Sequence, residues 1–264
     1  MRRLTNSRSA HPDASNLEGC DPISLEGDLA APAPDAIGSL RPFGRDIPEQ
    51  RLVPAATPVA GDDEELIRIR ALAERGRRLD AILALRKLLD ADPARIGPRV
   101  ELARQLADAS EWEEAIEQLT LAIERAAEPA PILVRRGALY AQQGQPKEAE
   151  RDFRDATRRD PSHWPAFRYL GITRLRLGAA GEAIGVLREA LSLAPQDPES
   201  VLYLGEALLT QGQLDEAHET LERAVAMLPT DPRGYTLLGR LFDRLGMTDE
   251  AMGMHRKARE VATP

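Results

Sequence analysis

The residues that could support catalysis are few, and none of them completes a known motif. His218 and Glu219 are the first two residues of a His-Glu-x-x-His zinc motif, in which two histidines bind the metal and the glutamate acts as a base, but Glu222 stands where the second histidine is required. The chain has no Gly-Lys dipeptide of a phosphate-binding loop and no Gly-x-Ser-x-Gly of a serine hydrolase. We therefore predict a protein without enzymatic activity.

Two other groups could share a proton or bind a metal ion. Glu113 and Glu114 are adjacent carboxylates, but they stand where a helix is expected to begin, and negative charge there interacts favourably with the helix dipole. Met247, Met252, Met254 and His255 offer soft metal donors. Methionine at helical spacing usually fills gaps in a core, so we predict no metal and no cofactor.

The elements that would position these residues follow a period of 34 residues. Alanine recurs at one position of every unit: Ala81, Ala115, Ala149, Ala183, Ala217 and Ala251. A small residue precedes each alanine by five positions: Gly76, Ser110, Gly144, Gly178, Gly212 and Gly246. A large side chain follows it by four: Leu85, Leu119, Phe153, Leu187, Leu221 and His255.

Each column has a physical reason that indicates a helical hairpin. Glycine between two amphipathic stretches suits the left-handed residue that ends a helix. Alanine lets the second helix approach the first, and the large residue four positions later shares its face. Proline after the second helix stops it, as at Pro93, Pro161, Pro195 and Pro229. One hairpin cannot bury its apolar face alone, so the hairpins are expected to stack.

Residues 1–61 have a different composition. They hold eight prolines among Ala, Gly, Ser and Asp, without helical or alternating apolar periodicity. Such a segment cannot bury enough apolar surface to offset the entropy of ordering it, so we predict a disordered tail. A short linear motif around Phe43 is an alternative to a passive leader.

The repeated region resembles the tetratricopeptide repeat family. The third unit carries that family's pattern at Leu133, Gly137, Tyr140, Ala149, Phe153, Ala156 and Pro161, with Arg136 in place of a leucine. The first two units lack the early glycine and have Ile69 and Ala103 instead. The predicted units within 62–264 are 62–95, 96–129, 130–163, 164–197, 198–231 and 232–264. The resemblance implies an all-α, right-handed α-solenoid with first helices on its concave side and second helices on its convex side.

The resemblance also implies a site and a class of partner. Concave residues of this family come mainly from the fifth, ninth, twelfth and thirteenth positions of a unit. The expected groove residues are Arg168, Ile172, Leu175, Arg176, Leu202, Glu206, Arg240 and Arg244. Apolar side chains with arginines at intervals suit a peptide that has apolar anchors and carboxylates. The carboxylate clamp of chaperone-binding members is incomplete, since Ile172 and Tyr203 stand where it has asparagines.

We therefore expect a scaffold or adaptor that binds a protein or peptide. The alternative is a structural subunit that assembles through the convex face or the array ends, with its groove occupied by the tail. The net charge of −8 argues against nucleic acid, and no apolar stretch approaches a membrane span. A single cysteine, Cys20, and the lack of a signal peptide favour a cytoplasmic protein, and 32 Arg against 3 Lys suggest a bacterial one. Polar residues such as Glu65, Arg68 and Arg256 indicate finished array ends.

Overall fold

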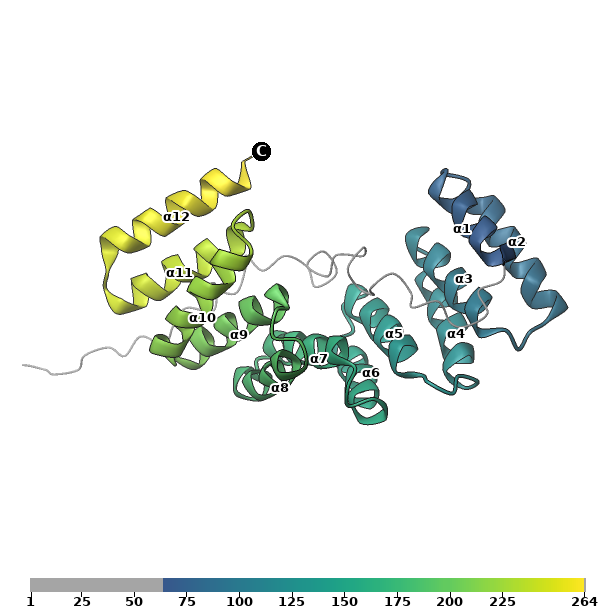
Figure 1. Cartoon of the computed structure of the whole chain (residues 1–264), viewed down its shortest axis with the longest axis horizontal. Coiled ribbons are helices and arrows are strands. Elements are labelled where there is room, and N and C mark those ends of the chain that lie inside the picture. Colours follow the sequence, from purple (N-terminus) through teal and green to yellow (C-terminus); the bar gives the residue numbers. More distant parts are fainter. Residues whose placement is uncertain (1–63, 264) are drawn as a thin grey trace, which may run out of the picture. The chain divides into compact units, whose positions relative to one another are not determined.

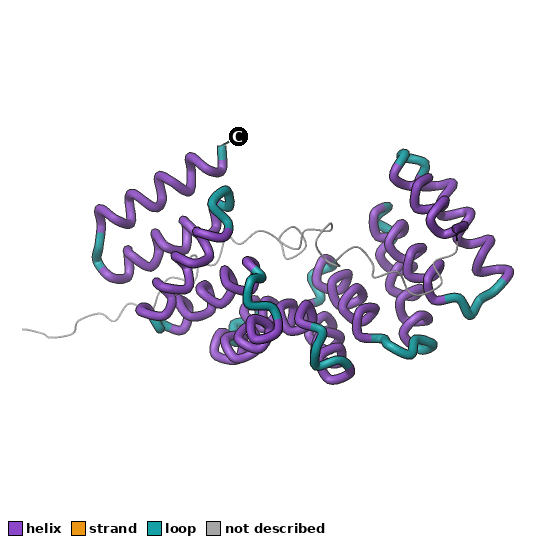
Figure 2. Tube along the Cα trace, in the orientation of Figure 1, coloured by secondary structure: helices purple, strands orange, loops and turns teal. Residues whose placement is uncertain are grey.

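The computed structural model describes residues 64–263, in which twelve helices and no strand occur (Figures 1 and 2). The helices are α1 (Glu64–Glu74), α2 (Arg78–Ala91), α3 (Ile96–Asp108), α4 (Trp112–Ile123), α5 (Ala130–Gln142), α6 (Pro146–Arg159), α7 (Trp164–Arg176), α8 (Ala180–Leu193), α9 (Pro198–Gln211), α10 (Leu214–Met227), α11 (Pro232–Leu245) and α12 (Thr248–Ala262). The predicted all-α solenoid is confirmed. The predicted disordered tail lies outside the described residues.

The helices form six consecutive hairpins, here numbered one (α1–α2) to six (α11–α12). The odd-numbered helix is the first helix of its hairpin, and the even-numbered helix is the second. The two helices of a hairpin pack on each other, and the second helix also packs on the first helix of the next hairpin. Short turns join the two helices of each hairpin (Figure 2). None of the helices within residues 64–263 is long and apolar enough to cross a membrane.

The turn within each hairpin depends on the glycine column. Its five glycines have φ between 73° and 82°, in the left-handed region that is open to glycine, and Ser110 takes φ 65° at the sixth position. At Gly212 the N–H donates to the carbonyl of Leu209, and the next N–H, of Gln213, donates to Leu208. These bonds satisfy carbonyls that the end of the helix would otherwise leave unpaired.

The alanine column lies fully inside the hairpins, as predicted. All six alanines are at most 1% exposed. A second close approach involves the early glycine of hairpins three to six: a Cβ added at Gly171 would lie 2.6 Å from Cγ of Leu187. The two helices of such a hairpin are therefore close enough that only glycine fits opposite the large residue.

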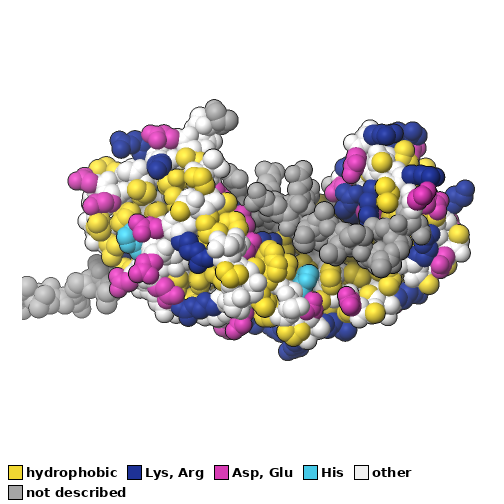
Figure 3. All heavy atoms as spheres, in the orientation of Figure 1, with side chains coloured by type: hydrophobic (Ala, Val, Ile, Leu, Met, Phe, Trp, Pro, Cys, Tyr) yellow, Lys and Arg dark blue, Asp and Glu magenta, His cyan; other side chains and the backbone are white. Residues whose placement is uncertain are grey.

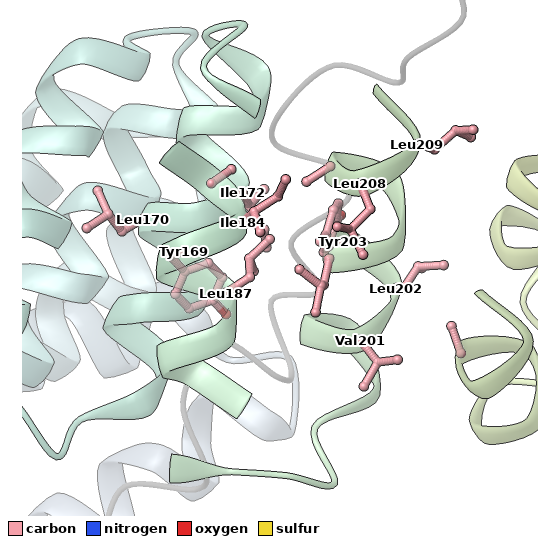
Figure 4. Packing of buried hydrophobic residues seen from close by; sticks show 14 of the residues in the cluster. Tyr169, Leu170, Ile172, Ile184, Leu187, Val201, Leu202, Tyr203, Leu208 and Leu209 are labelled. Carbon is pink, nitrogen blue, oxygen red and sulfur yellow. The ribbon is translucent and has the colours of Figure 1, made fainter. Parts of the chain in front are cut away.

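The buried apolar residues form two clusters that meet at α5. One cluster extends from Leu66 to Leu139, and the other from Ala130 to Ala251. In the second cluster, Ile184 and Leu187 of α8 lie on one side of a hairpin junction and Tyr203 of α9 on the other (Figure 4). The array is therefore held together by packing between neighbouring hairpins as well as within them.

Candidate functional site

The first helices of neighbouring hairpins also contact one another directly. Such contacts join α1 to α3, α5 to α7, α7 to α9 and α9 to α11. The side of the array that these helices form is called the first-helix face below. All eight sequence-predicted groove residues belong to the first helices α7, α9 and α11. On the view in Figure 3, charged side chains of both signs lie among hydrophobic ones.

The eight predicted groove residues differ greatly in exposure. Arg168, Ile172 and Leu202 are buried in the packing between helices. The half-buried members are Leu175, Arg176 and Glu206, and the exposed ones are Arg240 and Arg244. Arg244 donates a hydrogen bond to the backbone carbonyl of Leu209 on α9. The accessible part of the predicted groove therefore consists of these last five side chains.

Arg168 is held by its neighbours on α7 and α9. Its guanidinium lies 3.0 Å from the carboxylate of Asp197, donates to the hydroxyl of Tyr169 at 2.9 Å, and stands 5.0 Å from the ring centroid of Trp164. Burial by itself lowers the pKa of Arg168, but Tyr169, Asp197 and Glu199 outweigh that effect and raise the pKa, so the group stays charged. Because Asp197 also caps α9, this pair fixes the start of α9 against α7.

A second arginine repeats this arrangement one hairpin later. Arg233 of α11 reaches Glu199 at 2.8 Å and the hydroxyl of Tyr203 at 3.1 Å, both on α9, and also Asp231 at 2.6 Å, which caps α11. Sequence reasoning missed this network. The usable signal was the pair of opposite charges one repeat length apart, at Glu199 and Arg233, next to an Asp-Pro helix start.

A third cluster of charged side chains lies on α1, α3 and α5. Glu101 of α3 is buried and accepts hydrogen bonds from Arg104 at 2.5 Å, Gln105 at 2.8 Å and Arg70 at 3.1 Å. Burial raises the pKa of Glu101, but Arg104, Gln105 and Arg70 together hold that pKa below its usual value. Burial lowers the pKa of Arg135 on α5, with Arg104 and Arg70 adding to the effect. One carboxylate thus anchors two arginines and a glutamine, and its charge partly offsets the effect of burial on the pKa of Arg135.

A small cavity of about 350 Å³ opens beside the Arg168 network. It is bounded by the indole of Trp164 at the start of α7, by Pro195 in the α8–α9 connection and by Pro198 at the start of α9. Among the described residues, no three His, Cys, Asp or Glu side chains come together as a metal site would require. The polar chemistry available on this face is therefore charge pairing and hydrogen bonding.

Comparison with known proteins agrees with the repeat pattern. Two models described as tetratricopeptide repeat match residues 134–198 and 174–241. A search of curated proteins gave no match.

Several solved structures are similar in fold. MamA from Desulfovibrio magneticus RS-1 is 22% identical with a TM-score of 0.59, over 63% of this chain and 94% of that one. YrrB, described as a TPR protein with an unusual peptide-binding site, is 24% identical with a TM-score of 0.58, over 67% and 92%. A tetratricopeptide repeat protein from Parabacteroides merdae is 19% identical with a TM-score of 0.66, over 76% and 80%.

Proposed function

Since this chain belongs to the tetratricopeptide repeat family, we propose that its first-helix face binds an extended peptide segment of another protein. The general role of an interaction scaffold is supported by the stacked hairpins, because solenoids present extended surfaces for binding. The peptide-binding site ascribed to YrrB concerns that protein, and it supports the proposal as an analogy of fold. No catalytic role is part of this proposal.

The observation that carries the proposal is the arginine pair on α11. Arg240 and Arg244 are both exposed and stand four residues apart, so they lie on the same side of the helix. Like charges at this spacing destabilise an isolated helix by about 0.2–0.5 kcal/mol. A carboxylate of a bound peptide would remove this repulsion and form charge-assisted hydrogen bonds with both guanidiniums.

The remaining accessible groove residues define what the peptide should contain. Leu175 is a half-buried apolar side chain, and Arg176 beside it supplies a further guanidinium. The preferred segment therefore carries carboxylates spaced along an extended backbone, with an apolar anchor near α7.

The test is a selection followed by affinity measurements on the full-length chain. Short random peptides displayed on phage are selected on the immobilised protein, and the enriched sequences are measured by fluorescence anisotropy. We expect enrichment of Asp and Glu, and an affinity loss of about tenfold or more in an Arg240→Glu, Arg244→Glu variant, because charged hydrogen bonds contribute about 1.5–3 kcal/mol.

Arg158→Glu is the matched control, since Arg158 is exposed on a second helix, α6. Equal affinities for the wild type and the double variant would exclude α11 from the site. If peptides bind only after residues 1–61 are deleted, the groove is occupied by the chain's own tail, as the alternative role requires.

A second role, as an assembly subunit that acts through the array ends, is favoured by a different observation. Ile67 of hairpin one and Met252 of hairpin six are 57% and 58% exposed. Large apolar side chains of this kind are normally buried. The expected polar residues at the array ends are therefore accompanied by exposed apolar ones.

A further inference from the structure

The sixth hairpin presents an open slot between α11 and α12. The slot has a volume of about 770 Å³. Its lining includes Pro232 and Thr236 of α11 and Met252, His255 and Arg256 of α12. Two repeat lengths earlier, the residues equivalent to Met252 and His255 are Ile184 and Leu187, which are buried. The slot is therefore the place where the first helix of a following hairpin packs in the rest of the array.

The internal junctions show what fills such a slot. The first helix of the next hairpin lies against the second helix at α6–α7, α8–α9 and α10–α11. Tyr203 fills the position facing Ile184 and Leu187 (Figure 4). Tyr169 fills the same position one junction earlier, where its ring stacks on Phe153 at 5.5 Å. Both tyrosines are at most 3% exposed.

Ile67 is the residue of hairpin one at this position. It precedes Tyr169 by three repeat lengths, on the side of α1 that corresponds to the packed side of α7. No helix precedes α1 within the described residues, and the side chain of Ile67 is largely exposed. Hairpin one thus presents an exposed apolar residue, and hairpin six presents an open slot. Together they have the two parts of a junction like those between neighbouring hairpins.

The two end hairpins carry opposite charges at the positions where neighbouring hairpins form ion pairs within the array. Arg86 pairs with Glu114 at 2.9 Å, and Arg188 pairs with Glu216 at 2.6 Å, each across a junction and each spanning 28 residues. Arg256 occupies the arginine position of this pattern in the last hairpin.

Asp80 occupies the acidic position of the same pattern in the first hairpin, where it accepts a hydrogen bond from Arg77 at 2.7 Å and is partly exposed. Two of the five internal junctions form this pair: Thr120 and Glu222 stand at the arginine position of hairpins two and five, and Arg154 pairs with Glu150 on its own helix. Stacking hairpin one on hairpin six in the internal register would place Asp80 beside Arg256.

We propose that copies of this chain associate head to tail, with hairpin one of one copy seated in the α11–α12 slot of another. Ile67 packs against Met252 and His255, and Asp80 pairs with Arg256 across the contact. The contact joins two different surfaces, so each dimer keeps one free surface of each kind and can add further copies. This inference rests on the assembly role and is independent of peptide binding on the first-helix face.

The test measures the mass of the full-length protein by sedimentation velocity over a range of concentrations. We expect the average mass to rise with concentration for the wild type. Ile67→Glu and Met252→Glu should each remain monomeric, with self-association weakened at least tenfold. An equimolar mixture of the two variants should form a dimer, because each retains the surface that the other lacks.

Leu83→Glu is the matched control, since Leu83 is 63% exposed on hairpin one but stands where other hairpins have Glu117, Arg151 and Glu219. It should assemble like the wild type. A charge exchange adds an independent readout: Asp80→Arg and Arg256→Asp should each weaken association, and the chain carrying both should recover it.

Three outcomes would overturn the proposal: a monomeric wild type at all concentrations, assembly that survives both single variants, or a mixture that stays monomeric. The affinity of the Ile67→Glu variant for the peptides selected on the wild-type protein is measured in the same experiment. Unchanged peptide binding in a chain that no longer assembles separates the end contact from the first-helix face.

Discussion

The ring of Phe153 on α6 stacks on the ring of Tyr169 on α7, with centroids 5.5 Å apart and planes inclined by 24°. On its other side, Phe153 faces Gly137 of α5, where an added Cβ would lie 2.8 Å from the ring. Phe153 is therefore confined between its own hairpin and the next one. Because a rigid ring fills this space, the junction has little room to adjust.

Substitution of Gly137 tests this confinement. Gly137→Ala should lower the free energy of unfolding by about 1–3 kcal/mol, because the new methyl group displaces the Phe153 ring from its stack. Gly185→Ala is the matched control, since a Cβ there meets nothing within 4 Å, and it should be neutral or stabilising by up to about 1 kcal/mol. Urea unfolding followed by circular dichroism measures both. Equal effects would show that the junction can relax.

Ser110 gives a second test of the repeat pattern. It is the one described residue other than glycine with positive φ, and it occupies the glycine column. Ser110→Gly should raise the free energy of unfolding by about 0.5–1 kcal/mol, because the left-handed conformation strains any side chain. Gly178→Ser, at the same position of hairpin four, should lower it by a similar amount. A loss of stability in Ser110→Gly would contradict this reading of the turn.

The glycine and alanine columns were predictable from the sequence because each is determined by a local structural requirement. The five turn glycines are set by backbone conformation, and the alanines by the spacing of two helices within one hairpin. Both constraints recur every 34 residues, so the repeat reveals them without knowledge of the tertiary structure. In hairpins three to six the early glycine lies directly opposite a large side chain, as Gly171 lies opposite Leu187, whereas hairpins one and two have Ile69 and Ala103 at this position.

The detail of the first-helix face was less predictable, because it depends on partners in the next hairpin. Arg168 was expected to face a ligand, yet its partner Asp197 lies 29 residues later and its aromatic neighbours draw the side chain into the interface. Helical periodicity gives the direction of a side chain at Cα. It does not say whether a long side chain then turns toward solvent or toward the following helix.

The Arg168–Asp197 pair should contribute strongly to stability. Both side chains are 8% exposed, so removing one leaves the other buried without its partner. Arg168→Met should lower the free energy of unfolding by about 3–5 kcal/mol. A double-mutant cycle with Asp197→Ala should give a coupling energy above about 1 kcal/mol. Arg158→Met, which affects an exposed pair with Asp155, should change stability by less than about 1 kcal/mol. A coupling near zero would mean that Arg168 contributes through packing alone.

The pH dependence of stability should report on Glu101. The pKa of this carboxyl is lowered in the folded chain, so the folded state binds fewer protons than the unfolded state as the pH falls. The stabilisation is fully present above the unfolded pKa of about 4.3 and is lost as the pH drops through the folded value. Arg104 and Gln105 donate hydrogen bonds to this carboxylate, so they stabilise its ionised form although the group is buried.

Glu101→Gln removes this titration and isolates its contribution. At pH 7 the variant should be less stable than the wild type by about 1.5–3 kcal/mol, because it lacks the charged acceptor for Arg70 and Arg104. The difference should shrink as the pH falls below the unfolded pKa of about 4.3 and be lost once the folded carboxyl is protonated as well. Urea unfolding at several pH values measures this difference. Glu124→Gln, at an exposed carboxylate near Arg125, should stay close to the wild type throughout. A difference for Glu101→Gln that is the same at pH 3 and pH 7 would show that the ionised carboxylate is not what stabilises the cluster.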